Sequence, residues 1–213
     1  STLTSIGASA FEKCTGMTGG LTIPGSVSSI GAYAFQNCTG LDGKLIIEAG
    51  EAKTIGLYAF SGCNRLTGVV LGNGITAIGS HAFIGCTGMT GDLVIPDSVT
   101  IINSYAFYNC TGFNGTLTLS ENLTDIYVYA FYNCKNITGE LVIPDRVTEI
   151  GSYAFQRMSS LTSIVLGEGL SWIGSTGIYD SFSPFYDCPG IKEVTFHSLT
   201  GPQMDRQMVS SRT

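Results

Sequence analysis

Residues 93–110 read Leu-Val-Ile-Pro-Asp-Ser-Val-Thr-Ile-Ile-Asn-Ser-Tyr-Ala-Phe-Tyr-Asn-Cys, and variants of this stretch recur along the whole chain. The copies align on eight phenylalanines, spaced by 23 to 25 residues and by 30 before the last one: Phe11, Phe35, Phe60, Phe83, Phe107, Phe131, Phe155 and Phe185. Self-similarity at a period of about 20 to 50 residues is typical of solenoids. Because each unit of a solenoid stacks mainly on its neighbours, the repeat predicts one elongated domain.

Two apolar patterns alternate within each copy. The first is a triplet such as Leu93-Val94-Ile95, which has the composition of a short strand and ends at a proline or glycine. Its outer residues are expected to face one way and its middle residue the other. The second pattern places apolar residues at i, i+4, i+5 and i+8, as in Ile150, Ala154, Phe155 and Met158. This spacing predicts a short helical or 3₁₀ segment of about two turns, and strands that alternate with such segments predict a parallel sheet.

Cysteine forms a column of its own. Three residues after the phenylalanine, all copies but one carry a cysteine, and Met158 takes that place in the remaining copy. Methionine can replace a buried apolar thiol but not half of a disulfide, and the close Cys-x₂-Cys spacing of zinc sites does not occur. We interpret the cysteines as buried structural thiols, with disulfides between neighbouring coils or a metal site as alternatives. The two histidines, His81 and His197, lie far apart, and no metal or cofactor is predicted.

The repeat unit L-x-x-(G)-L-x-I-P-x-x-V-x-x-I-G-x-Y-A-F-x-x-C resembles the BspA-like class of leucine-rich repeats. Residues 41–63, 89–110 and 137–158 show the pattern well, and the resemblance covers residues 1–199. It implies an α/β leucine-rich-repeat solenoid, a right-handed coil of about eight repeats of 23–25 residues. A parallel β-sheet would cover one face and short helical or 3₁₀ segments the other. Residues 200–213 are polar and are expected to form a C-terminal tail or a partial cap.

The resemblance also implies a function. BspA-like proteins are typically bacterial cell-surface or secreted proteins linked to adhesion to host matrix proteins and to other cells. The chain is therefore expected to be a non-enzymatic, extracellular or cell-surface module that binds a protein or glycan on a host or neighbouring cell. It opens in the middle of a repeat without a signal peptide, so we expect a mature or excised fragment.

Two other functions remain open at this stage. The chain could be a structural spacer or stalk segment of a larger surface protein, without a ligand of its own. It could also be a carbohydrate-active enzyme of the β-helix type, which would need a pair of carboxylates such as Asp92 and Glu140 on one sheet face. No catalytic constellation stands out in the sequence, so neither an enzymatic activity nor a small-molecule substrate is predicted.

Composition narrows the range of partners. Charged residues make up 12% of the chain, the formal net charge is −6 and the isoelectric point is near 4.7. An acidic chain without a basic patch is not expected to bind nucleic acid. No apolar run approaches the roughly 18 residues of a membrane span, so insertion into a membrane is not predicted.

Two columns are candidate partner-binding surfaces. The middle residues of the triplets should point outward from the sheet, and they are Thr22, Ile46, Val70, Val94, Thr118 and Val142. Solenoids often bind partners across such a surface, although ordinary strand propensity on a solvated face explains the same residues. Tyrosines that lie two residues before the phenylalanine, among them Tyr105, Tyr129 and Tyr153, form the second column. Tyrosine is enriched at interfaces, but these rings could equally pack along the wall. The insertion at residues 175–183 is expected to be a binding loop or a C-terminal seal.

Overall fold

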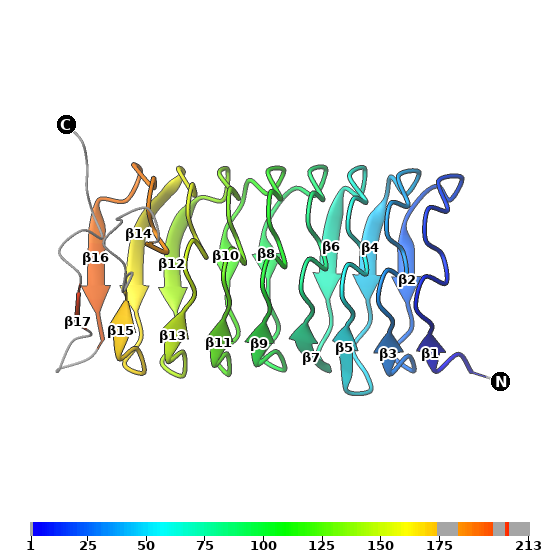
Figure 1. Cartoon of the computed structure of the whole chain (residues 1–213), viewed down its shortest axis with the longest axis horizontal. Coiled ribbons are helices and arrows are strands. Elements are labelled where there is room, and N and C mark those ends of the chain that lie inside the picture. Colours follow the sequence, from blue (N-terminus) through cyan, green and yellow to red (C-terminus); the bar gives the residue numbers. More distant parts are fainter. Residues whose placement is uncertain (1, 174–182, 198–202, 205–213) are drawn as a thin grey trace.

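The computed structural model describes residues 2–173, 183–197 and 203–204. These residues form a nearly straight stack of flat coils, with the N-terminal coil at one end of the long axis (Figure 1). Two layers of short strands run the length of the stack, and the strands of one layer point opposite to those of the other. A seven-stranded sheet, with one strand from each coil, gives the described part of the chain about seven turns.

The apolar triplets form the first layer, which we call the triplet sheet. Its strands pair in parallel in three groups, β2-β4-β6, β8-β10 and β12-β14-β16. Equivalent residues of successive coils are aligned, for example Leu21 with Leu45 and Leu45 with Val69. The strands are β2 (Leu21–Ile23), β4 (Lys44–Ile47), β6 (Gly68–Leu71), β8 (Leu93–Val94), β10 (Leu117–Thr118), β12 (Gly139–Ile143), β14 (Leu161–Leu166) and β16 (Glu193–Phe196).

The second layer contains a sheet that the repeat pattern did not predict. Each isoleucine five residues before a phenylalanine lies in a short strand, and these strands pair in parallel in chain order. They are β1 (Ser5–Ile6), β3 (Ser29–Ile30), β5 (Lys53–Ile55), β7 (Ile75–Ile78), β9 (Ile101–Ile102), β11 (Asp125–Ile126) and β13 (Glu149–Ile150). β15 (Trp172–Ile173) pairs with β17 (Gln203–Met204), which belongs to the polar C-terminal segment. Residues 175–182 of the predicted insertion at 175–183 lie outside the described residues.

The predicted helical or 3₁₀ segments are wrong. No residue that the structure describes is helical, and the run from the isoleucine to the cysteine is a series of turns. Two positions of that run have a left-handed backbone, at φ 60° for Tyr33 and 57° for Asn37, and the pattern repeats at Tyr105 and Asn109. A helix needs a φ near −63° at every residue, so this backbone excludes it. The described fold is therefore an all-β, leucine-rich-repeat-like solenoid.

Hydrogen bonds between coils explain why the turns form. The amides of Tyr33, Phe35 and Asn37 donate to carbonyls of the next coil, at 2.8, 2.7 and 2.7 Å. The amides between them close i→i−3 turns, as Ala34 does onto Gly31 at 3.3 Å. Alternating donors thus bond along the stack and within the coil. Because buried amides need partners, the neighbouring coil decides the conformation of this segment.

Stacked side chains fill the space between the two layers. The phenylalanine rings lie face over face, and the ring centroids of Phe83 and Phe107 are 5.0 Å apart. Phe107 has no exposed surface, whereas Phe11 at the N-terminal end is 40% exposed. This continuous column of buried rings, flanked by the aligned isoleucines and leucines, is the core of the solenoid.

The cysteines line the core as free thiols, as the sequence predicted. From the second coil onward each Sγ donates to the carbonyl of the phenylalanine in the preceding coil, at 3.0 Å for Cys110 to Phe83 and 3.1 Å for Cys134 to Phe107. Burial raises the pKa of the Cys63 and Cys134 thiols to about 12. The column therefore holds protonated thiols that fill space and also bond one coil to the next.

Lys53 is the exception among the core residues. It aligns with Ile75 in the next coil and is 2% exposed. Its Nζ donates to the carbonyls of Gly25, at 3.2 Å, and Glu48, at 3.4 Å. Burial lowers the pKa of Lys53. The register shifts beside Lys53, because Lys53 pairs with Ile75 and Thr54 with Ala77. The lysine stem replaces an aliphatic side chain.

Candidate functional site

The first candidate surface is the outward column of the triplet sheet. Val94 is 54% exposed, while its strand neighbours Leu93 and Ile95 are 0% and 1% exposed, as alternation along a strand requires. The outward residues stand in register on paired strands, Val70 beside Ile46 and Thr118 beside Val94. The column comprises Thr22, Ile46, Val70, Val94, Thr118, Val142, Val165 and Thr195. The sheet thus presents a row of β-branched side chains to solvent.

A second outward column lies two residues upstream, and it contains Asp92 and Glu140, which the sequence offered as a carboxylate pair on one sheet face. We call its C-terminal part the acidic rim, which consists of Asp92, Thr116, Glu140, Ser163 and Glu193. Strand pairing places Glu140 beside Ser163 and Ser163 beside Glu193. The repeat alignment held the signal for this rim, because these residues precede the middle residue of each triplet by two.

Hydrogen bonds couple the members of the acidic rim. Thr116 donates to Asp92 Oδ1 from its backbone amide at 2.7 Å and from its hydroxyl at 3.0 Å. These two bonds, the backbone one first, lower the pKa of the Asp92 carboxyl. The Ser163 hydroxyl donates to Glu140 Oε2 at 3.3 Å. Each hydroxyl therefore bonds to the carboxylate of the preceding coil.

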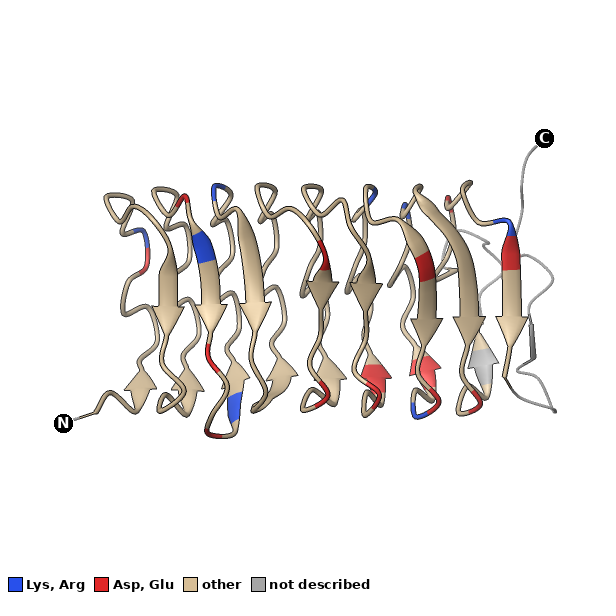
Figure 2. Cartoon of the chain, turned by 180° about the vertical axis from the view of Figure 1, so that it is seen from behind, with Lys and Arg blue, Asp and Glu red and all other residues tan. Residues whose placement is uncertain are grey.

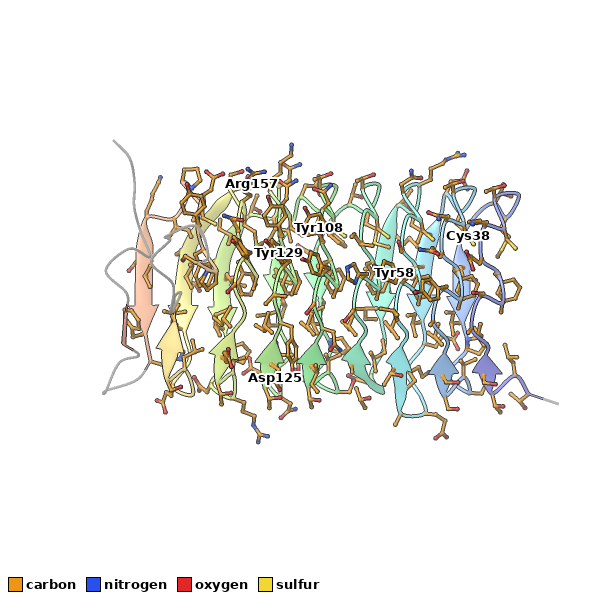
Figure 3. The ribbon with its side chains drawn as sticks, viewed as in Figure 1. Cys38, Tyr58, Tyr108, Asp125, Tyr129 and Arg157 are labelled. Atoms are coloured by element: carbon orange, nitrogen blue, oxygen red, sulfur yellow. The ribbon has the colours of Figure 1, made fainter. Side chains whose placement is uncertain are left out.

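The second candidate surface is the tyrosine column, which lies on the face opposite to the triplet sheet (Figures 1 and 3). Ring centroids are 4.6 Å apart between His81 and Tyr105, 4.8 Å between Tyr105 and Tyr129, and 4.4 Å between Tyr129 and Tyr153. All these rings are half-buried. Burial raises the pKa of the Tyr129 hydroxyl to about 12. Because the ring faces cover one another, the column offers ring edges and hydroxyls rather than open faces.

Two further tyrosines and an arginine lie beside the tyrosine column, and we call the column together with these three residues the tyrosine wall. The centroids of Tyr108 and Tyr132 are 4.8 Å apart, and both rings contact the edge of Tyr129. The Arg157 guanidinium lies 5.6 Å from the centroid of Tyr132, within cation–π range, and its Nε is 3.5 Å from Asp187 Oδ2. The sequence analysis did not single out Arg157, because its contacts come from a different coil.

Acidic residues also gather along one long edge of the solenoid (Figure 2). This edge contains the turns that join the triplet strands to the strands of the second sheet. Toward the C-terminal end it carries Asp97, Glu121, Asp125, Asp145, Glu149 and Glu168, with Arg146 among them. The His197 Nδ1 lies 3.4 Å from Asp145 Oδ1 at this edge. Negative charge thus borders the triplet sheet on the side away from the acidic rim.

The geometry does not favour the candidate glycosidase pair. Asp92 and Glu140 lie two strands apart, which is about 9.6 Å at the usual strand spacing. This exceeds the separation of about 5 to 5.5 Å in retaining enzymes and falls at the upper limit of the roughly 6.5 to 9.5 Å in inverting ones. Thr116 lies between them and donates its hydroxyl to Asp92. Within the described ranges, no three His, Cys, Asp or Glu side chains are arranged to hold a metal ion. The same ranges contain no helix with the length and hydropathy of a membrane span.

Comparisons with known proteins agree with this architecture. Solved structures that resemble the chain include a leucine-rich cell surface protein from Faecalibacterium prausnitzii, with a TM-score of 0.56 and 20% identity over 90% of this chain and 63% of that one. They also include the leucine-rich repeat protein TpLRR from T. pallidum, with a TM-score of 0.51 and 21% identity over 83% of this chain and 68% of that one. At these identities the likeness shows the fold alone.

The chain spans less than two thirds of the length of the Faecalibacterium protein. None of the curated proteins compared with it matches. The family comparison is specific, because the model of the BspA-type leucine-rich repeat region matches residues 1–111 and 90–201, with six copies. These matches follow the same triplets, phenylalanines and cysteines that build the two layers and the core. The chain therefore belongs to the BspA-type leucine-rich repeat family.

Proposed function

We propose that this solenoid is a non-enzymatic binding module at the cell exterior and that it engages a protein partner through the triplet sheet. The observation that carries the proposal is the outward column, in which Val70, Val94 and Val142 are 49%, 54% and 40% exposed. Exposed apolar surface that is continuous over several strands often marks a contact site. A stacked array also offers such a surface along its whole length.

The tyrosine wall supports a protein partner over a glycan. Recognition of a sugar by aromatic residues uses an open ring face, and the rings from Tyr33 to Tyr153 cover one another along the stack. Amphipathic ring edges and hydroxyls remain, which are suited to polar contacts at a protein interface. We therefore assign the tyrosine wall a secondary role and the triplet sheet the main one.

The proposed cell-exterior location is supported by the family and by the Faecalibacterium relative, which is described as a cell surface protein. Antibodies against the folded chain should label intact, unpermeabilised cells that produce the parent protein. Labelling only after permeabilisation would contradict this location.

The binding role can be tested with a variant that keeps the strands. Changing Val70, Val94 and Val142 to threonine together preserves β-branched side chains while it removes apolar surface. We expect the unmodified chain to bind at least one member of a panel of purified matrix proteins saturably, as measured by surface plasmon resonance. The triple variant should lose at least tenfold in affinity for that protein.

The same measurement separates binding from a spacer role. Val128→Thr serves as the control, because it makes the same chemical change at an exposed valine of a turn segment and leaves the outward column intact. Unchanged melting temperatures of all proteins would show that folding is not at issue. If the unmodified chain binds none of the panel, or if the valine variant binds as well as the control, the binding proposal for this face fails. The spacer role then becomes the better explanation.

A further inference from the structure

We infer that the partner of the triplet sheet is a basic polypeptide segment that lies along the solenoid from Asp92 to Glu193, with apolar side chains on the outward column and Lys or Arg side chains on the acidic rim. This inference rests on the proposed function. It adds the chemistry of the partner, the half of the sheet that the partner covers and the orientation in which the partner lies.

The first argument is the spacing of the carboxylates. Asp92 directly precedes β8, and Glu140 and Glu193 lie in β12 and β16, so one carboxylate occurs on every second strand of the stack. At a strand spacing of about 4.8 Å, the carboxylates recur every 9.6 Å or so. A segment that lies along the stack can therefore place successive cationic side chains on successive carboxylates.

The second argument is that two of the three carboxylates, those of Asp92 and Glu140, are held in place before a partner arrives. Both Thr116 bonds end on Asp92 Oδ1, and the Ser163 bond ends on Glu140 Oε2. A carboxylate can accept about four hydrogen bonds, so these exposed groups retain capacity for an incoming ammonium or guanidinium. A side chain that is already fixed loses less conformational entropy when a partner binds.

The third argument is the distribution of charge around the outward column. Val94, Thr118 and Val142 lie between the acidic rim on one side and the acidic turns that include Asp97 and Asp145 on the other (Figure 2). Charge complementarity therefore favours a basic partner over this half of the sheet. An acidic or polyanionic partner would meet like charge on both sides of the column.

Lys44 makes the charge of this surface differ between its N-terminal and C-terminal ends. It occupies the rim column on β4, and its stem lies along Gly68, 3.8 Å from where a Cβ of that glycine would be. The column that contains the acidic rim is thus positive at Lys44, near the N-terminal coils, and negative from Asp92 onward. A segment with cations at one end and an anion at the other would bind in a single orientation.

The test uses two synthetic amphipathic peptides of equal length, one of leucine and lysine and one of leucine and glutamate. Both offer the same apolar face, so only their charge differs. Isothermal titration calorimetry of the full chain should show at least about tenfold tighter binding of the lysine peptide in low salt. The difference should shrink as salt rises, because exposed ion pairs are screened beyond about 10 Å at 0.1 M.

Matched variants locate the binding. Asp92→Asn with Glu140→Gln and Glu193→Gln neutralises the rim with isosteric amides. Glu12→Gln with Glu51→Gln and Asp187→Asn changes the net charge equally at positions outside the triplet sheet and outside the C-terminal acidic turns that border it. We expect about a tenfold loss of lysine-peptide affinity in the first variant and less than twofold in the second. Equal losses would mean that net charge alone attracts the peptide, which would overturn the inference.

The two proposals can fail independently. If the lysine and glutamate peptides bind equally, or the rim variant keeps full affinity, the basic partner is wrong. The valine-to-threonine variant still decides by itself, on the matrix-protein panel, whether the triplet sheet is a binding face. Circular dichroism melts of each rim variant would show that lost affinity does not come from lost structure.

Discussion

The phenylalanine column allows a strict test of the stacking on which the fold depends. Phe107 is fully buried, and its ring lies 5.0 Å from that of Phe83 and 5.3 Å from that of Phe131. Truncation of a buried phenylalanine to alanine costs about 3 to 5 kcal/mol. Phe107→Ala also removes two stacked pairs, each worth about 0.5 to 1.5 kcal/mol beyond burial, so we expect a loss in the upper part of that range.

Phe11 provides a control within the same column. It is 40% exposed and its ring stacks on Phe35 alone among the described rings, at 5.0 Å. Burial of a phenylalanine is worth roughly 1.5 to 3 kcal/mol when complete, and one stacked pair adds about 0.5 to 1.5 kcal/mol. With about 60% of its surface buried, Phe11→Ala should therefore cost about 1.5 to 3 kcal/mol. The two substitutions remove the same atoms, so their difference measures the position in the stack.

Urea unfolding followed by far-ultraviolet circular dichroism would measure both free energies. Because a solenoid is held by interfaces between neighbours, Phe107→Ala should also lower the slope of the transition if the two halves begin to unfold separately. The Phe11 variant should keep the slope of the unmodified chain. Equal losses for Phe107→Ala and Phe11→Ala would refute a continuous stack of buried rings.

The thiol column, one left-handed turn and the tyrosine wall each support a further prediction. Burial raises the pKa of the Cys63 and Cys134 thiols to about 12, against 9.0 when unperturbed, so the unfolded chain releases these protons first and stability falls as the pH rises above 9. The loss should be about 1.4 kcal/mol per buried thiol at pH 10. Urea unfolding measured from pH 8 to 10.5 should show this loss, and in Cys134→Ala the free energy of unfolding should depend less on pH. A free energy of unfolding that does not change over this range would contradict the burial. Gly85 has a φ of +72° and open space where a Cβ would lie. Gly85→Ala should therefore destabilise the chain by about 1 to 2 kcal/mol through backbone strain alone. An unchanged melting temperature would contradict the left-handed turn. Tyr105→Ala should cost clearly less than Phe107→Ala in the same urea series, because Tyr105 is only half-buried, and an equal cost would reverse the assignment of inside and outside.

Part of this structure could be predicted because the repeat encodes it locally. The alternation in Leu93-Val94-Ile95 places the middle residue outside in every copy, since strand side chains alternate between faces. The substitution of Met158 for cysteine likewise indicated that the column is buried and free of disulfides. The first inference depends on alternation within one copy, and the second depends on comparing one copy with the others.

The turn segment could not be predicted in the same way. Ile150, Ala154, Phe155 and Met158 have the spacing of a helix, and the same spacing serves a chain of turns. The choice depends on whether an amide such as Phe131 bonds inside its own coil or to Ala154 of the next, which it does at 2.7 Å. Local spacing carries no information about that distant carbonyl.

The sequence by itself determined the period of the coil, the residues of the core and the outward direction of the valine column, because these follow from comparison of the copies, from residue type and from alternation within each triplet. Only the tertiary structure decided that the second layer is a sheet joined to turns, that Thr116 and Ser163 hold the carboxylates of the acidic rim, and that the tyrosine faces are covered. These features need hydrogen bonds and ring contacts between residues about one repeat apart. They form only when successive coils are stacked in register.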